Sequence, residues 1–307
     1  MRHLRRTLLA CAVGLALSSP ALADPALWKV SDADSEIYLF GSVHVFTREM
    51  DDWRSDAFDA ILKSADHVVF EVVLDIEAYS TITQISFTKG RLTGGQSLSQ
   101  LLSTEDYDKV VAAAGKTGID IAMLEHVQPW LATVMLMGAA MPKASAGVET
   151  LLDAEVAPER KRGLETAAEQ MGFFADAPLD EQIDGLISTA DGIEAGLVGM
   201  LDPLIAAWES GDTAALHATM TEQIQPRDRA IMERLIDERN KRWLTPIEKL
   251  LADNDESLLV VGAGHLVGPM GVPALLKERG YTVERVDEPP AGGPAATAQR
   301  PSATQRR

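Results

Sequence analysis

Two short apolar runs, at residues 67–72 and 257–262, constrain the fold more than any other feature of this sequence. Runs of this length with almost no polar residue are typical of strands that are covered on both faces, as in parallel sheets. A β-hairpin is predicted over residues 27–40, and further short strands over 161–164 and 281–286. The chain therefore needs helices to cover both faces of a sheet.

Helical patterns lie between the predicted strands and supply that cover. They fall at residues 56–64, 127–141, 149–157, 166–174, 179–190, 197–210, 213–223 and 228–243. Strands that alternate with helices predict an α/β fold with a central mixed, partly parallel sheet flanked by helices. The helical stretch between residues 75 and 141 is interpreted as a long excursion between early strands, not as a second domain. Residues 245–248 (Thr-Pro-Ile-Glu) have the form of a capping box with an early proline, which predicts a break in the last long helix.

The first 23 residues have the composition of a secretory signal peptide. Three arginines precede an apolar run over residues 8–17, and Ala21-Leu22-Ala23 is a typical A-x-A cleavage sequence. The apolar run is too short to span a membrane. We therefore expect cleavage after Ala23 and a periplasmic or secreted protein. An α/β domain is expected over residues 24–287, followed by a disordered tail over 288–307 because Pro, Ala, Gly, Gln and Arg dominate there.

Cys11 is the only cysteine and would be removed with the signal peptide. The processed chain then has no disulfide, no thiolate nucleophile and no cysteine metal ligand. Any metal has to be held by histidine and carboxylate side chains, which favours Zn, Mn, Co or Fe.

The net charge excludes some classes of partner. Residues 1–23 carry three arginines and no acidic residue, so their removal changes the net charge from −18 to −21. Such an acidic protein is not expected to bind nucleic acid or anionic membranes. No later stretch approaches 18 consecutive apolar residues, so no membrane span is expected. The expected partner is a peptide or small-molecule substrate, and the sequence does not define the oligomeric state.

Two Gly-x-x-His turns carry the strongest functional signal. Gly41-Ser42-Val43-His44 follows one predicted strand, and Gly262-Ala263-Gly264-His265 follows another. Ligands of open α/β sheets bind beyond the carboxyl ends of the strands, where both histidines are expected. A structural role is the alternative for each histidine alone. The remaining histidines of the processed chain, His67, His126 and His217, are interpreted as ordinary surface or core residues.

Carboxylates at strand ends are the next candidates. Glu71 interrupts an apolar strand, where a carboxylate is costly unless it is paired, hydrogen-bonded or bound to metal. Glu165 follows the short strand at residues 161–164, although it could also be a first-turn acid of the next helix. A solvent-facing Glu71 on an edge strand is the corresponding alternative. Glu149 is a weaker candidate because a helix is predicted to begin near it.

Arg239 and Asn240 are predicted to lie on a buried helix face. Arg239 is spaced four residues from both Leu235 and Trp243, which belong to an apolar stripe. A buried arginine needs a carboxylate, a phosphate or a substrate oxygen opposite it. The alternative is an arginine that extends past the edge of the stripe into solvent.

The chain resembles the TraB/GumN family, which is related to the Tiki proteases and more distantly to erythromycin-esterase and ChaN-like proteins. The resemblance covers about residues 26–287. It rests on the segments Tyr38-Leu39-Phe40-Gly41-Ser42-Val43-His44-Val45, Phe70-Glu71-Val72, Gly147-Val148-Glu149, Leu164-Glu165-Thr166, Glu169-Gln170, Trp208, Gly211-Asp212, Glu238-Arg239-Asn240 and Val260-Val261-Gly262-Ala263-Gly264-His265-Leu266-Val267-Gly268. The resemblance implies an α/β fold with paired Gly-x-x-His motifs and a buried set of glutamate and arginine residues.

Metal-assisted hydrolysis of a peptide or amide bond is the leading hypothesis, because the Tiki relatives are metal-dependent proteases. The expected metal ligands are His44, Glu71, Glu165 and His265, with one histidine or glutamate serving as the base. Arg239 is expected to neutralise the developing oxyanion, and Asn240 to donate a hydrogen bond to it.

Two alternatives remain. In a metal-independent, esterase-like hydrolase, His44 would activate water while Glu71 orients it. In a periplasmic metal- or haem-binding protein, the same cleft would act as a receptor, as the ChaN-like relatives suggest.

Overall fold

A computed structural model describes residues 24–50, 52–141 and 146–286 of the protein. The expected signal peptide and C-terminal tail lie outside these residues. Within the described part, no helix is long and apolar enough to cross a membrane.

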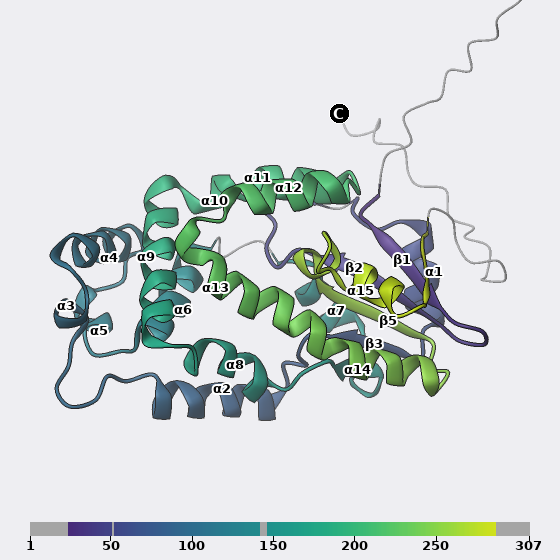
Figure 1. Ribbon diagram of the computed structural model, residues 1–307, viewed down its shortest axis with the longest axis horizontal. Coiled ribbons are helices and arrows are strands. Elements are labelled where there is room, and N and C mark those ends of the chain that lie inside the picture. The colour runs from purple at the N-terminus through teal and green to yellow at the C-terminus, as the bar shows by residue number, and fades with distance from the viewer. Residues whose placement is uncertain (1–23, 51, 142–145, 287–307) are drawn as a thin grey trace, which may run out of the picture.

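The strands of the described part form a six-stranded sheet in the order β4-β3-β5-β2-β1-β6 (Figure 1). Their bounds are Leu27–Ser31 (β1), Glu36–Ser42 (β2), His67–Phe70 (β3), Lys161–Gly163 (β4), Ser257–Gly262 (β5) and Thr282–Arg285 (β6). The neighbours from β4 to β2 pair in parallel, whereas β1 pairs antiparallel with both β2 and β6. The predicted mixed, partly parallel α/β sheet is confirmed. Four strands therefore end at the same edge.

Many helices surround the sheet. Their bounds are Asp56–Ser64 (α1), Ile76–Lys89 (α2), Leu98–Leu101 (α3), Thr104–Thr117 (α4), Ile121–Leu124 (α5), Pro129–Ala140 (α6), Val148–Glu155 (α7), Pro158–Arg160 (η1), Ala167–Ala175 (α8), Leu179–Ala195 (α9), Leu197–Met200 (α10), Asp202–Glu209 (α11), Thr213–Gln223 (α12), Pro226–Asp228 (η2), Arg229–Met232 (α13), Glu233–Asp237 (η3, a π-helix), Glu238–Ala252 (α14), Ala263–Leu266 (η4) and Val272–Glu278 (α15).

Alternate residues of the central strands enter different cores, which explains why the strands are apolar throughout. Val260 of β5 packs in a core with Phe58 of α1 and Trp208 of α11. Its neighbour Leu259 packs on the other face with Trp243 of α14 and with α15. Helices α3 to α6 form a third apolar cluster with α9, away from the sheet.

The predicted break at Pro246 is wrong, because α14 runs through this proline. A proline inside a helix removes a backbone hydrogen bond and costs about 3 kcal/mol. Buried residues on both sides of it, Trp243 and Leu244 before and Ile247 and Leu251 after, keep the helix against the sheet. The irregular segment comes earlier, at the π-helical turn Glu233–Asp237 that precedes α14.

Candidate functional site

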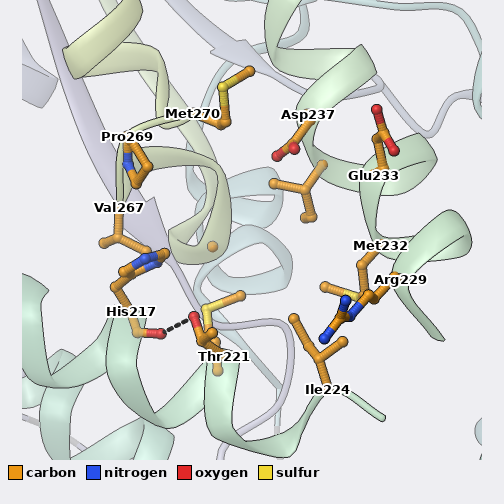
Figure 2. A pocket seen from close by; sticks show the side chains of 13 residues that line it. His217, Thr221, Ile224, Arg229, Met232, Glu233, Asp237, Val267, Pro269 and Met270 are labelled. Atoms are coloured by element: carbon orange, nitrogen blue, oxygen red, sulfur yellow. Dashed lines mark hydrogen bonds between the residues drawn. The ribbon is translucent and has the colours of Figure 1, made fainter. Parts of the chain in front are cut away.

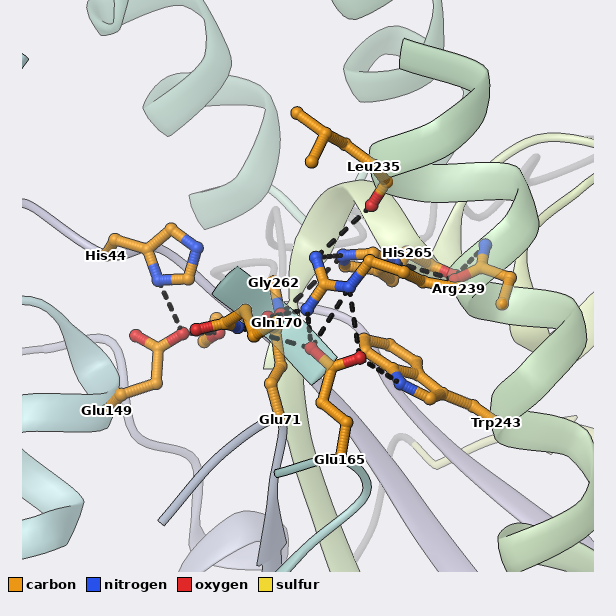
Figure 3. A network of polar contacts seen from close by, with 12 residues as sticks. His44, Glu71, Glu149, Glu165, Gln170, Leu235, Arg239, Trp243, Gly262 and His265 are labelled. Atoms are coloured by element: carbon orange, nitrogen blue, oxygen red, sulfur yellow. Dashed lines mark hydrogen bonds and ion pairs between the residues drawn. The ribbon is translucent and has the colours of Figure 1, made fainter. Parts of the chain in front are cut away.

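The two Gly-x-x-His turns lie side by side at one edge of the sheet. Strands β2 and β5 are parallel neighbours, with Ser42 opposite Gly262. His44 and His265 therefore leave the sheet at the same edge, as Figure 3 shows. Glu71 follows the end of β3 and Glu165 follows β4, the next two strands of that sheet. Strand β3 is shorter than predicted and ends at Phe70, so Glu71 begins the loop instead of interrupting the strand.

Arg239 lies at the centre of the polar network (Figure 3). Its Nη2 donates to Glu71 Oε2 at 2.6 Å and to Glu165 Oε1, and its Nε donates to Glu165 at 3.1 Å. Its Nη1 donates to the Leu235 carbonyl at 3.2 Å and contacts His265 Nε2 at 3.2 Å. A guanidinium has five N–H donors, and these contacts use all five. The side chain is only 8% exposed. Because its donors are all used, Arg239 neutralises two buried carboxylates and has no N–H left for a substrate.

Both carboxylates are further held by the protein. Glu71 Oε1 accepts the Gly262 N–H at 2.8 Å, and Glu165 Oε2 accepts the Trp243 indole N–H at 3.2 Å. Gln170 Nε2 lies 3.4 Å from Glu71 Oε2 and 3.3 Å from Glu165 Oε1. Burial by itself raises the pKa of Glu71, but the surrounding His265, Arg239 and His44 and the Gly262 N–H outweigh it and lower this pKa to about 2. Glu71 is thus an anion at any ordinary pH.

His265 is held as a neutral imidazole. Asn240 Nδ2 donates to the carbonyls of His265 and Met270, at 3.2 and 2.7 Å, so its Oδ1 is the acceptor that faces His265 Nδ1 at 2.7 Å. Nδ1 therefore carries the proton, and Nε2 accepts from Arg239. Burial lowers the pKa of His265 to about 4, which agrees with this assignment. Asn240 is fully buried and positions His265, so it does not face a substrate as the sequence analysis expected.

His44 differs from His265 because its side chain is 69% exposed and forms a pair with Glu149. Its Nδ1 lies 2.8 Å from Glu149 Oε1, which also accepts a hydrogen bond from Ser42. The hydrogen bond to Glu149 raises the pKa of His44 to about 9. The other nitrogen, Nε2, faces Gly262. His44 thus has the arrangement of a general base whose protonated form is stabilised by a carboxylate.

Glycine at position 147 lets helix α7 approach the loop that carries His44. A Cβ at Gly147 would lie 2.1 Å from the His44 carbonyl carbon, and the Val148 N–H donates to the Val43 carbonyl at 2.9 Å. The first turn of α7 therefore packs directly on the backbone of the turn, which places Glu149 beside His44.

The lack of a side chain at Gly262 lets three polar groups come close to its backbone. A Cβ built at Gly262 would lie 3.2 Å from Glu71 Oε1 and 3.4 Å from His44 Nε2. It would also lie 3.6 Å from His265 Cδ2. Both the exposed histidine and the buried carboxylate therefore border the position where a side chain is missing.

The donors of the predicted metal site do not fit a divalent cation in this arrangement. Glu71, Glu165 and His265 face the guanidinium of Arg239, and the second nitrogen of His265 is taken by Asn240. The four predicted ligands have eight side-chain nitrogen and oxygen atoms. Of these, only Nε2 of His44 makes no hydrogen bond to the described residues. Across residues 24–50, 52–141 and 146–286, no three His, Cys, Asp or Glu side chains are grouped so as to hold an ion.

Three residues of the network were missed or ranked low from the sequence. Glu149 was a weak candidate because its helix gives no sign of which strand end it meets. Trp243 was assigned only to the apolar stripe, although its spacing of four from Arg239 placed both on one helix face. Gln170 lies in the first turn of α8, five residues after Glu165, a spacing that gives no helical-face signal.

Comparisons with known proteins agree with the resemblance described above. The model of the TraB/PrgY/gumN family matches residues 26–285. A protein named "Metalloprotease TIKI homolog" from Amphimedon queenslandica is 24% identical over 325 residues, which cover 88% of this chain and 63% of the relative. The chain thus spans less than two thirds of that relative's length. No solved structure matches it.

Proposed function

The chain belongs to the TraB/PrgY/gumN family, and on this premise we propose that it is a hydrolase in which His44 acts as the general base. One observation carries the proposal: His44 Nε2 and Glu71 Oε1 converge on one point, since both lie within 3.4 Å of the position that a Cβ would take at Gly262. The name of the sponge relative, a metalloprotease, favours a peptide or amide bond as the target. The periplasmic or secreted location stays a prediction from the N-terminal sequence.

In the proposed reaction, a water molecule sits above Gly262 between His44 and Glu71. His44 Nε2 removes a proton as the water oxygen attacks the scissile carbonyl carbon, and it returns that proton to the leaving group. Glu149 stabilises the imidazolium formed in between, and Glu71 accepts a hydrogen bond from the second O–H of the water, which stays on the attacking oxygen. Arg239 and Asn240 are positioning residues, because they fix Glu71, Glu165 and His265 without reaching the substrate.

Gly262→Ala tests this arrangement directly. The new methyl group would occupy the space of the water, so we expect kcat to fall by about 100-fold or more, the scale that a 1 Å misplacement can produce. The protein should stay folded, because the backbone at Gly262 (φ −49°, ψ 131°) suits alanine and the methyl group meets only side-chain atoms. The measurement is cleavage of a synthetic peptide mixture, read by mass spectrometry, alongside thermal unfolding. Gly115→Ala, where a Cβ meets nothing within 4 Å, is the control. Wild-type activity in Gly262→Ala would contradict the proposal.

Glu149→Gln should shift the pH dependence of the reaction. Activity of a general base rises with pH through its pKa, which for His44 is raised to about 9 by Glu149. Glutamine removes the charge, so the rising limb of kcat/KM should move to lower pH while the plateau falls, because the base is weaker. Glu155→Gln, at the exposed end of the same helix, should leave the profile unchanged. An unmoved limb in Glu149→Gln would show that another group is the base.

A second candidate function, metal-dependent hydrolysis, is favoured by the name of the relative. It would require Arg239 to leave the position between Glu71 and Glu165. We expect protein purified without chelators to contain less than a tenth of an equivalent of Mn, Fe, Co or Zn, and its activity to resist EDTA. Elemental mass spectrometry of wild type, His44→Ala and His265→Ala decides this. A stoichiometric metal that both variants lose would support the metal-dependent reading instead.

A further inference from the structure

A cavity lies next to the polar network, between α12, the α13–η3 segment and the η4 turn (Figure 2). Its volume of about 360 Å³ is at the lower end of the range of ligand pockets, roughly 300–1,000 Å³. A cavity of this size can hold one amino-acid side chain, as large as an aromatic ring, or a short acyl group. It is too small for a peptide segment of several residues.

Walls shared with the polar network connect this cavity to the proposed reaction. Gly264, which precedes His265, lines it, and so does Met270, whose carbonyl accepts the Asn240 amide at 2.7 Å. Ile236 also lines it and follows Leu235, whose carbonyl holds Arg239 at 3.2 Å. A group in the cavity would therefore contact the backbone segments that hold His265 and Arg239 in place.

Three methionines contribute to the apolar part of the lining, which His217 and Thr221 of α12 and the charged residues described below complete. Met220 of α12, Met232 of α13 and Met270 after η4 come from three separate elements, and each is only half-buried. Methionine is flexible and polarisable, and it is common at surfaces that bind varied apolar groups. Gly264 keeps the space open, because a Cβ there would lie 2.6 Å from Met220 Cε.

The η3 wall is irregular in a way that suits a binding site. It is a π-helical turn, in which the Glu238 N–H bonds to the Glu233 carbonyl five residues earlier. Such turns occur often at functional sites. Charged residues of this segment, Arg229, Glu233 and Asp237, line one side of the cavity, opposite Val267 and Pro269 (Figure 2).

We propose that this cavity, defined by Met220, Met232, Ile236, Gly264, Val267 and Met270, is the subsite for an apolar side chain or acyl group of the substrate beside the bond that is cleaved. This inference rests on the proposed hydrolase function and adds the substrate class. The enzyme selects substrates by an apolar group of about the size of leucine, phenylalanine or a hexanoyl chain.

Two probe esters, p-nitrophenyl acetate and p-nitrophenyl hexanoate, test the selectivity. Met232→Trp would fill the cavity, so the ratio of kcat/KM for hexanoate over acetate should fall at least tenfold, since a single methylene in such a pocket changes kcat/KM about 10- to 200-fold. Met123→Trp is the matched control, because Met123 is 63% exposed on α5 and should leave the ratio unchanged. Equal ratios in wild type and Met232→Trp would overturn the subsite.

A binding measurement keeps this test separate from the hydrolase proposal. Methyl-labelled methionine NMR of the His44→Ala protein, titrated with N-acetyl-phenylalaninamide, should shift the signals of Met220, Met232 and Met270 but not that of Met123. Shifts without hydrolysis of any ester or peptide by wild type would retain the cavity as a binding site for an apolar group and reject both the hydrolase and the role of the cavity as its subsite. Hydrolysis with unmoved signals from the three cavity methionines would retain the enzyme and reject the subsite.

Discussion

Replacing Arg239 by methionine should lower the free energy of unfolding by about 3–5 kcal/mol, the usual cost of removing one partner from a buried ion pair. The expected loss is large because the guanidinium neutralises Glu71 and Glu165 together, and their side chains are 11% and 6% exposed. It also contacts the Trp243 ring, with Cζ 4.9 Å from the ring centroid. Urea unfolding followed by circular dichroism is the measurement.

Arg242→Met is the matched control for this prediction. Arg242 lies on the same helix and contacts the Phe173 ring, with Cζ 4.9 Å from the ring centroid. An exposed cation–π contact of this kind contributes about 0.5–1 kcal/mol, so the variant should be only slightly destabilised. Similar losses in the two variants would mean that the two carboxylates are not compensated by Arg239.

Replacing His44 by alanine should lower kcat by about 10²–10⁴-fold, the range that general acid–base catalysis contributes. Thermal unfolding is measured alongside, because the variant also loses the pair between His44 and Glu149, although Glu149 keeps its hydrogen bond from Ser42. Imidazole added to the assay should restore part of the activity, since the missing ring leaves an accessible space beside Glu149.

His126→Ala controls for the loss of a histidine away from the site. The His126 side chain is exposed, and its hydrogen bond among the described residues is between Nδ1 and the Gln96 carbonyl, at 3.2 Å. It should hydrolyse the peptide mixture like wild type. Undiminished activity in His44→Ala would assign the base to another residue and remove the main support for the proposed reaction.

The position of the candidate site was predictable from sequence because it depends on strand ends. Short apolar runs identified β3 and β5, although the first was predicted to extend past Phe70, and Gly-x-x-His turns identified where β2 and β5 end. Helical spacing likewise placed Arg239 on a buried face. Each of these patterns lies within one short segment of the sequence, so it can be recognised without knowing which segments are neighbours in the fold.

The partners within the site were not predictable in the same way. Which carboxylate meets Arg239, and that Glu149 lies beside His44, depend on contacts between segments far apart in the chain. The expected roles of Arg239 and Asn240 toward an oxyanion assumed free donors, whereas both side chains use theirs within the protein. The expected break at Pro246 failed because packing on both sides of the proline outweighs its local preference.

The guanidinium of Arg239 joins the ends of β3 and β4 to α14, and Glu71 is 168 residues before it in the chain. Amides of the Glu71, Glu165 and Gly262 region should accordingly exchange with solvent only when the whole domain opens, and not through local fluctuations. Two other segments make fewer polar contacts than this charged network. They are the exposed turn that carries His44 and the part of α12 that lines the cavity with Met220. Accommodation of different substrates would then fall to those two segments, while the charged centre between them stays the same from one turnover to the next.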